Sequence, residues 1–223
     1  MAFGFRSVND SSYVQIDADS PRLCVLERGS YGGTNYVANV VFARPVTTQE
    51  PPMVFIRPTV TASNELYRTM ALQGSAGNWT GFRMSMMNIN YQPTGQWFVA
   101  TFASRGTDSF GMRLFDASAN LIFDTGAYAV AFTSVLQSWT YAGQVQLSVG
   151  ALYKWIAGRA LGADEFFMLN VFSLACQDAT AGGTCAVSMD YANNQACMWS
   201  NSVSGVWLDQ GNRPVVMAKI IAT

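Results

Sequence analysis

Two stretches of this chain read almost alike: residues 3–17 are FGFRSVNDSSYVQID and residues 110–124 are FGMRLFDASANLIFD. Each has a Phe-Gly-x-Arg strand, a polar turn, and an alternating strand that ends in aspartate, which is the pattern of a β-hairpin. The two stretches align without a gap, and five positions are identical. These are Phe3, Gly4, Arg6, Ser11 and Asp17, matched by Phe110, Gly111, Arg113, Ser118 and Asp124.

The matched arginine and aspartate are expected to face each other across each hairpin. An exposed ion pair is worth only about 0–1 kcal/mol, so strand register is its main benefit. Alternation also predicts that Val14 and Ile16 share a face in the first copy, as Leu121 and Phe123 do in the second.

The likeness continues at a growing offset. Residues 53–56 correspond to 166–169, and residues 95–102 correspond to 211–218, which implies loop insertions in the second copy. The sequence therefore predicts two tandem, duplicated modules, 1–107 and 108–223, each large enough to hold its own core. The alternative is chance similarity among strands rich in glycine and phenylalanine.

Strand signals dominate the rest of the chain. Residues 185–191 alternate, whereas the apolar runs at 53–56, 98–100 and 166–169 are typical of strands buried on both faces. Turn residues separate such segments at intervals of about 8–12 residues, which predicts a sandwich or barrel. We expect an all-β fold of two jelly-roll-like β-sandwich modules, with at most one or two short helices, at 64–72 and 154–161.

Composition narrows the function classes. Half of the 223 residues are hydrophobic and 12% are charged, a charged share about half the usual one. Either other subunits cover part of the surface, or a β-protein rich in Ser, Thr, Asn and Gln is simply less charged. The net charge of −1, without a basic cluster, indicates no nucleic-acid partner.

Two segments bear on membranes and export. The uncharged stretch 125–153 is interrupted throughout by polar residues, so it predicts two or three strands and no membrane span. Residues 1–12 lack the apolar region of a secretory signal peptide.

The chain has no histidine, which excludes Ser-His-Asp and Cys-His catalysis and mixed Cys/His zinc sites. Cys176 and Cys185 flank a Gly-Gly turn and can form a disulfide, although buried thiols in a reducing cytoplasm are the favoured interpretation. Asp164 and Glu165 are adjacent, so on a strand they would point to opposite faces and not flank one glycosidic bond. We expect a non-enzymatic protein with no catalytic residue, cofactor or metal.

Glycan binding requires exposed aromatic rings beside amide and carboxylate groups. One segment with that composition contains Trp79, Asn88, Asn90, Tyr91 and Trp97. The other supplies the candidate receptor or glycan contacts Tyr191, Asn193, Asn194, Trp199, Asn201, Trp207 and Asp209. The alternative, which we favour, is that the tryptophans fill the core or a subunit interface.

The hairpin pattern of residues 3–17 and 110–124, including the phrase FDASANLIFD at 115–124, resembles small tail proteins of tailed bacteriophages. This chain carries Ser12 and Ala119 where glycine is common in that motif. The resemblance implies a structural virion protein of a phage tail tip, baseplate or tail-fibre attachment, made in the bacterial cytoplasm and assembled into the tail with hub and fibre proteins.

Such a protein is expected to form a homo-oligomer, with a trimer favoured. The alternative is a lectin-like module of the tail that binds a host-cell glycan or receptor protein. A polysaccharide hydrolase is the third hypothesis.

Overall fold

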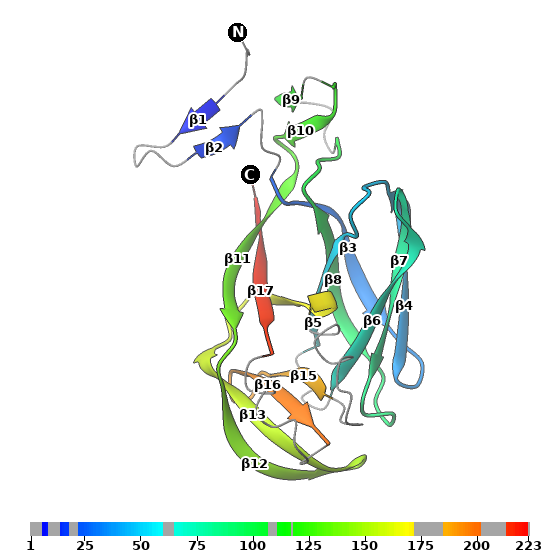
Figure 1. The fold of residues 1–223 in the computed structure, drawn as a ribbon, viewed down its shortest axis with the longest axis vertical. Coiled ribbons are helices and arrows are strands. Elements are labelled where there is room, and N and C mark those ends of the chain that lie inside the picture. Colours follow the sequence, from blue (N-terminus) through cyan, green and yellow to red (C-terminus); the bar gives the residue numbers. More distant parts are fainter. Residues whose placement is uncertain are drawn as a thin grey trace.

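The structure is a computed structural model that describes residues 6–8, 14–17, 22–59, 65–106, 111–116, 118–171, 185–201 and 213–222. These residues form an all-β fold whose only helical turn lies at 169–171, so the predicted fold class is confirmed. The strands belong to two separate hairpins and two larger antiparallel sheets, arranged like a sandwich (Figure 1).

The strands before residue 108 are β1 (Arg6–Val8), β2 (Val14–Asp17), β3 (Cys24–Gly32), β4 (Val37–Val46), β5 (Met53–Pro58), β6 (Tyr67–Ser75), β7 (Asn78–Met86) and β8 (Thr94–Thr101). Those after it are β9 (Arg113–Phe115), β10 (Leu121–Asp124), β11 (Tyr128–Leu136), β12 (Trp139–Leu147), β13 (Gly150–Ala160), β14 (Phe166–Met168), β15 (Cys185–Asp190), β16 (Gln195–Ser200) and β17 (Val215–Ala222).

Both large sheets take strands from each half of the chain. One is a six-stranded barrel in the order β11-β17-β14-β5-β8-β3, and the other is a seven-stranded sheet in the order β12-β13-β16-β15-β6-β7-β4. The main core lies between them. There, Val54 and Ile56 of the barrel face residues such as Phe82 and Met84 of the other sheet.

The strand order repeats across the predicted boundary at residue 107. In the barrel, β3-β8-β5 is followed by β14-β17-β11, and in the other sheet β4-β7-β6 is followed by β15-β16-β13, with β12 added at the edge. Corresponding strands therefore meet where the halves join, β5 with β14 and β6 with β15. Each half has the nested order of a jelly roll, and both sheets run continuously through the boundary.

The barrel interior explains why some strands are apolar at every position. On β8, Trp97 and Val99 face the main core, while Phe98 and Ala100 face the interior of the barrel. The Phe55 and Phe98 rings stack there with centroids 4.6 Å apart. The runs 53–56 and 98–100 are thus buried on both faces, as predicted.

Both predicted helices are strands. Residues 154–161 fall mainly in β13, where Trp155 and Ala157 enter the main core while Leu152 and Ile156 pack on the opposite face. Residues 67–72 belong to β6, which pairs with β7 along its length. Packing of alternating side chains against two apolar layers outweighs the helix propensity of the Lys, Arg, Ala and Leu residues in these segments.

The alternation predicted for residues 185–191 is only partly observed. All six residues of β15 are buried, because a third apolar cluster covers the second face of the sheet. This cluster consists of Leu66, Leu152, Ala186, Cys197 and Trp199.

Candidate functional site

The two repeated hairpins lie outside the large sheets, at the same end of the molecule (Figure 1). In the first, Arg6 pairs with Asp17 and the register shifts between Ser7 and Val8. In the second, Arg113 pairs with Asp124 and the register shifts between Leu121 and Phe123. The two hairpins thus share one register and one β-bulge at equivalent positions.

The Arg–Asp pairing predicted for the second hairpin is confirmed. Arg113 Nε lies 2.8 Å from Asp124 Oδ2, but the Asp124 side chain is only 2% exposed, so the pair is not the surface pair expected. Asp124 Oδ1 also accepts a hydrogen bond from the Gly126 amide at 2.8 Å. The bulge leaves Ile122 and Phe123 both buried, which corrects the simple alternation expected for this strand.

The turn of the second hairpin is organised by Asp116. Its Oδ1 accepts hydrogen bonds from the amides of Ser118 and Asn120, both at 2.8 Å, and its Oδ2 accepts one from the Asn120 side chain. These bonds hold the pKa of Asp116 below its usual value. Ala119 lies in the left-handed region, at φ 64°.

The barrel is closed at the hairpin end and open away from it. Its edge strands β3 and β11 share one register pair, Cys24 with Ala129, and the Val130 amide donates to the Leu23 carbonyl at 2.9 Å. Beyond that point the strands diverge (Figure 1). We call the resulting opening the β3–β11 slit. It exposes Phe132 by 50% and Val135 by 52%, although both lie on the interior-facing side of β11.

A hollow of about 330 Å³ lies in the barrel wall beside the slit and is lined by Arg28, Gly29, Ser30, Gln96, Trp97, Phe166 and Ile220. The Arg28 guanidinium lies 4.4 Å from the centre of the Tyr128 ring, so a cation–π contact joins β3 to β11 where their main-chain pairing has ended. None of the described residues that line this hollow is acidic.

A second hollow of about 420 Å³ adjoins the first through Ser30 and Gln96, and its lining includes Arg57, Thr94 and Tyr31. Arg57 donates to the Ala163 carbonyl and lies 3.6 Å from the exposed carboxylate of Asp164. The two hollows together place two arginines at the open end of the barrel.

Beneath the second hollow, Glu65 belongs to a buried polar network. Its Oε1 accepts hydrogen bonds from the Thr94 amide at 3.1 Å and the Thr94 hydroxyl at 2.9 Å, and its Oε2 accepts one from the Tyr67 hydroxyl. The Tyr67 and Tyr31 hydroxyls are 2.7 Å apart. The network therefore ties β3, β6 and β8 together.

Burial dominates the electrostatics of this network. Desolvation raises the pKa of Glu65 to about 7, against the opposing effect of its hydrogen bonds from Tyr67 and Thr94. Desolvation also raises the pKa of Tyr31 and Tyr67 well above the usual value. Since Glu65 is 2% exposed and both its oxygens have partners, the network connects buried strands and is not an acid–base site open to a substrate.

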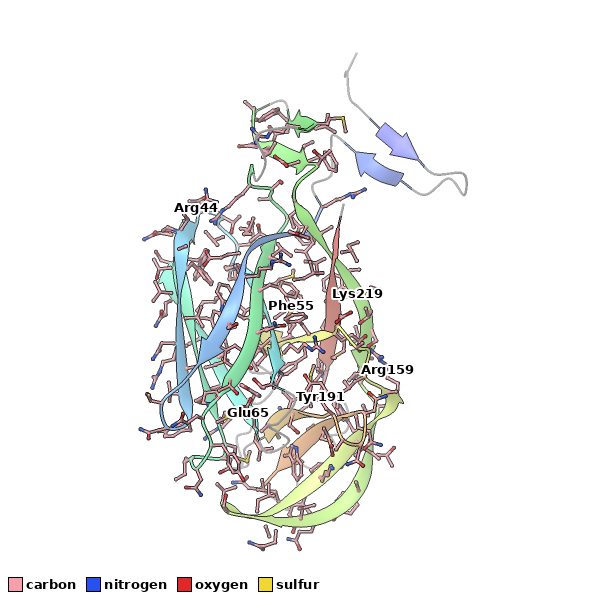
Figure 2. The ribbon with its side chains drawn as sticks, turned by 180° about the vertical axis from the view of Figure 1, so that it is seen from behind. Arg44, Phe55, Glu65, Arg159, Tyr191 and Lys219 are labelled. Carbon is pink, nitrogen blue, oxygen red and sulfur yellow. The ribbon has the colours of Figure 1, made fainter. Side chains whose placement is uncertain are left out.

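The predicted contact residues that the structure describes are not brought together on one open surface. Tyr191 is half-buried and its hydroxyl donates to the Pro58 carbonyl at 3.0 Å; it lies close to Glu65 (Figure 2). Asn193 and Asn194 are exposed in the β15–β16 turn, where Asp190 accepts bonds from the Asn193 amide and side chain. Asn201 is exposed, and Trp207 and Asp209 lie outside the described residues.

The structure corrects the prediction that Trp199 is an exposed contact residue. It is 5% exposed, and its indole nitrogen donates to the Ser188 hydroxyl at 2.9 Å. Its ring packs in the third apolar cluster and does not form a platform for a sugar. In the other predicted segment Trp97 is 4% exposed, and the Trp79 indole donates to the Thr48 carbonyl at 3.0 Å. The core interpretation thus holds for Trp97 and Trp199.

Asp164 and Glu165 lie in different surroundings, as expected for adjacent residues. Asp164 is exposed beside Arg57, whereas Glu165 is 6% exposed, pairs with Arg159 and accepts a hydrogen bond from the Gly162 amide at 2.7 Å. Cys24, Cys185 and Cys197 are buried. Cys176 lies outside the described residues, so its pairing with Cys185 stays a prediction.

Sequence reasoning did not single out Arg28, Arg57 or Glu65. Arg28 lies in β3, Arg57 lies in β5 and Glu65 precedes β6, none of them within a motif. Only the pairing of β3, β8 and β5 brings the two arginines to one end of the barrel. The one available signal was that Arg57 directly follows the apolar run 53–56, which was expected to be buried.

Within the described part of the chain, no group of three or more His, Cys, Asp or Glu residues is placed to hold a metal ion. The same residues include no helix long and apolar enough to cross a membrane. No protein-family model matches the chain, and no curated protein or solved structure shows significant similarity to it.

Proposed function

We propose that this chain is a structural protein of a bacteriophage tail, located at the tail tip or baseplate and assembled with hub and fibre proteins. The observation that carries the proposal is the pair of equivalent hairpins. Residues with the tail-protein motif form both of them, in one register and with one bulge. We further propose that the two halves arose by internal duplication, since their strands follow the same order in both sheets.

The position of the hairpins supports an assembly role. Both lie beyond one end of the sandwich, where they add nothing to its two sheets (Figure 1). On the second hairpin Met112 is 40% exposed and Phe115 is 55% exposed. Exposed apolar side chains on a projecting element are typical of protein–protein contacts, and we propose that this end meets neighbouring subunits of a homo-oligomer.

The lectin-like alternative loses part of its support. Trp199 is buried, Tyr191 is half-buried, and Asn193 and Asn194 belong to a tight turn. What remains of that hypothesis rests on the exposed Asn201 and on Trp207 and Asp209, which lie outside the described residues. We therefore propose receptor contact only as a secondary role of an assembled tail component.

Electron microscopy of phage particles tests the location. Particles from cells that carry this gene would be labelled with gold-conjugated antibody against the purified chain, with antibody against a capsid protein as the control. The proposal predicts label at the distal end of the tail. Label on the capsid, or intact tails that never carry label, would contradict it.

A further inference from the structure

We propose that the β3–β11 slit accepts an extended, acidic segment of a partner protein as an added β-strand. The inference goes beyond an assembly role at the hairpins, because the slit opens at the other end of the barrel. Three observations carry it: two strand edges that the described residues pair at one point only, an exposed apolar floor, and an arginine with no acidic residue beside it in the described lining of the hollow.

β3 and β11 each have one edge that faces the slit. β3 is paired with β8 from Cys24 to Gly32, and β11 is paired with β17 from Tyr128 to Leu136. Between the two strands, the described residues form only the Cys24–Ala129 register pair and the hydrogen bond from Val130. The second edge of each strand therefore offers main-chain donors and acceptors toward the slit, which is what an incoming strand requires.

The floor of the slit is apolar. Phe132 contacts Phe55 across the barrel with ring centroids 6.3 Å apart, yet Phe132 remains half-exposed. Phe55 lies in the middle of the body in Figure 2. A strand in the slit would direct every second side chain onto this floor, so an apolar residue at alternate positions would complete the barrel interior.

The positive charge of Arg28 favours an acidic segment in the slit. Arg28 lines the hollow beside the slit, and none of the described lining residues carries a negative charge. Its contact with the Tyr128 ring holds the guanidinium across the opening, where a carboxylate can accept a bidentate hydrogen bond. An extended segment with alternating apolar residues and one central Asp or Glu fits both features.

Binding of a designed peptide to the full chain tests the proposal. The probe is a fluorescent peptide of about eight residues, with valine at alternate positions, threonine between them and one central glutamate. Fluorescence anisotropy should show saturable binding, with a dissociation constant below about 1 mM. Arg28→Glu should weaken binding at least about tenfold, and a lysine-for-glutamate peptide should recover affinity on that variant.

Three controls keep the outcome clear. Arg44→Glu and Val41→Asp alter exposed residues on β4 in the other sheet and should leave binding unchanged. A peptide with alternate main-chain amides N-methylated should not bind the unaltered protein, which tests strand pairing without any substitution in the chain. Circular dichroism checks the folding of each variant.

The proposal is overturned if the glutamate peptide does not bind, if the N-methylated peptide binds equally well, or if the lysine peptide binds the unaltered protein as tightly. A change in the mass of the purified protein on Arg28→Glu would assign the slit to a second copy of this chain and would also overturn it. None of these results bears on the hairpins, so the tail proposal stands or falls separately.

Discussion

Single residues set local geometry that the sequence motif alone left open. Ala119 stands where glycine is common in the resembling tail proteins, and it adopts the left-handed conformation with φ 64°. An L-residue with a Cβ pays about 1–2 kcal/mol there relative to its preferred conformations. The hydrogen bonds around Asp116 hold the turn in place despite this cost.

Ala119→Gly is therefore expected to stabilise the protein. The free energy of unfolding should rise by about 0.5–1 kcal/mol, measured by urea denaturation. Ala131→Gly is the matched control, because Ala131 lies within β11 and glycine weakens a strand interior. A loss of stability in Ala119→Gly would contradict the assigned turn geometry.

Glu65 makes stability depend on pH. The pKa of Glu65 is about 7 in the folded protein against 4.5 for an unperturbed glutamate, so the folded state holds the extra proton between these values. The contribution of Glu65 to the free energy of unfolding is fully present below pH 4.5 and is lost as the pH rises through about 7. The temperature at the midpoint of thermal unfolding should accordingly decrease as the pH rises from about 5 to about 8.

Glu65→Gln should flatten that profile, because the amide stays neutral at every pH in this range. Glu50→Gln, at an exposed position, is the control and should leave the profile as it is. Thermal unfolding followed by circular dichroism at several pH values measures both. An unchanged slope in Glu65→Gln would show that another group titrates.

At the scale of elements, the apolar runs and the duplicated hairpin were predictable from the sequence. Runs such as 53–56 are apolar at every position because two separate cores cover β5. Segment 154–161 was misassigned because its residues favour helices locally, whereas one of its two neighbours in the sheet, β16, lies far away in sequence. The same distance hides the grouping of Arg28, Arg57 and Glu65, since strand pairing alone brings them together.

The second hairpin depends on the buried carboxylate of Asp124. Asp124→Ala removes the partner of Arg113 and of the Gly126 amide and should cost about 1–3 kcal/mol. Asp164→Ala is the matched control, because Asp164 is 85% exposed and 3.6 Å from Arg57, and it should cost less than about 0.5 kcal/mol. Equal losses in urea denaturation would contradict the distinction between the two pairs.

At the scale of the whole molecule, the predicted modules 1–107 and 108–223 share both sheets. Strands β5 and β14 pair in the middle of the strand order of the barrel, and β6 pairs with β15 in the other sheet. Sequence offsets detected the repeat, but they carry no information on which strand edges meet. The edges that β5 and β6 would leave open in the first half are covered by β14 and β15, the equivalent strands of the second.

Shared sheets predict cooperative unfolding. Differential scanning calorimetry should show one transition for the full chain, because opening either half exposes the core and strand edges of the other. Two transitions that are separately removed by core substitutions in each half, such as Phe82→Ala and Met198→Ala, would show two independent units instead.

Assembly through the hairpin end is the central claim, and the mass of the purified protein in solution tests it most directly. Light scattering should give a multiple of the 24.3 kDa chain mass. Phe115→Asp should reduce that mass, whereas Val41→Asp, at an exposed position on β4, should not. A 24.3 kDa species for the unaltered protein, or an assembly unaffected by Phe115→Asp, would contradict the account.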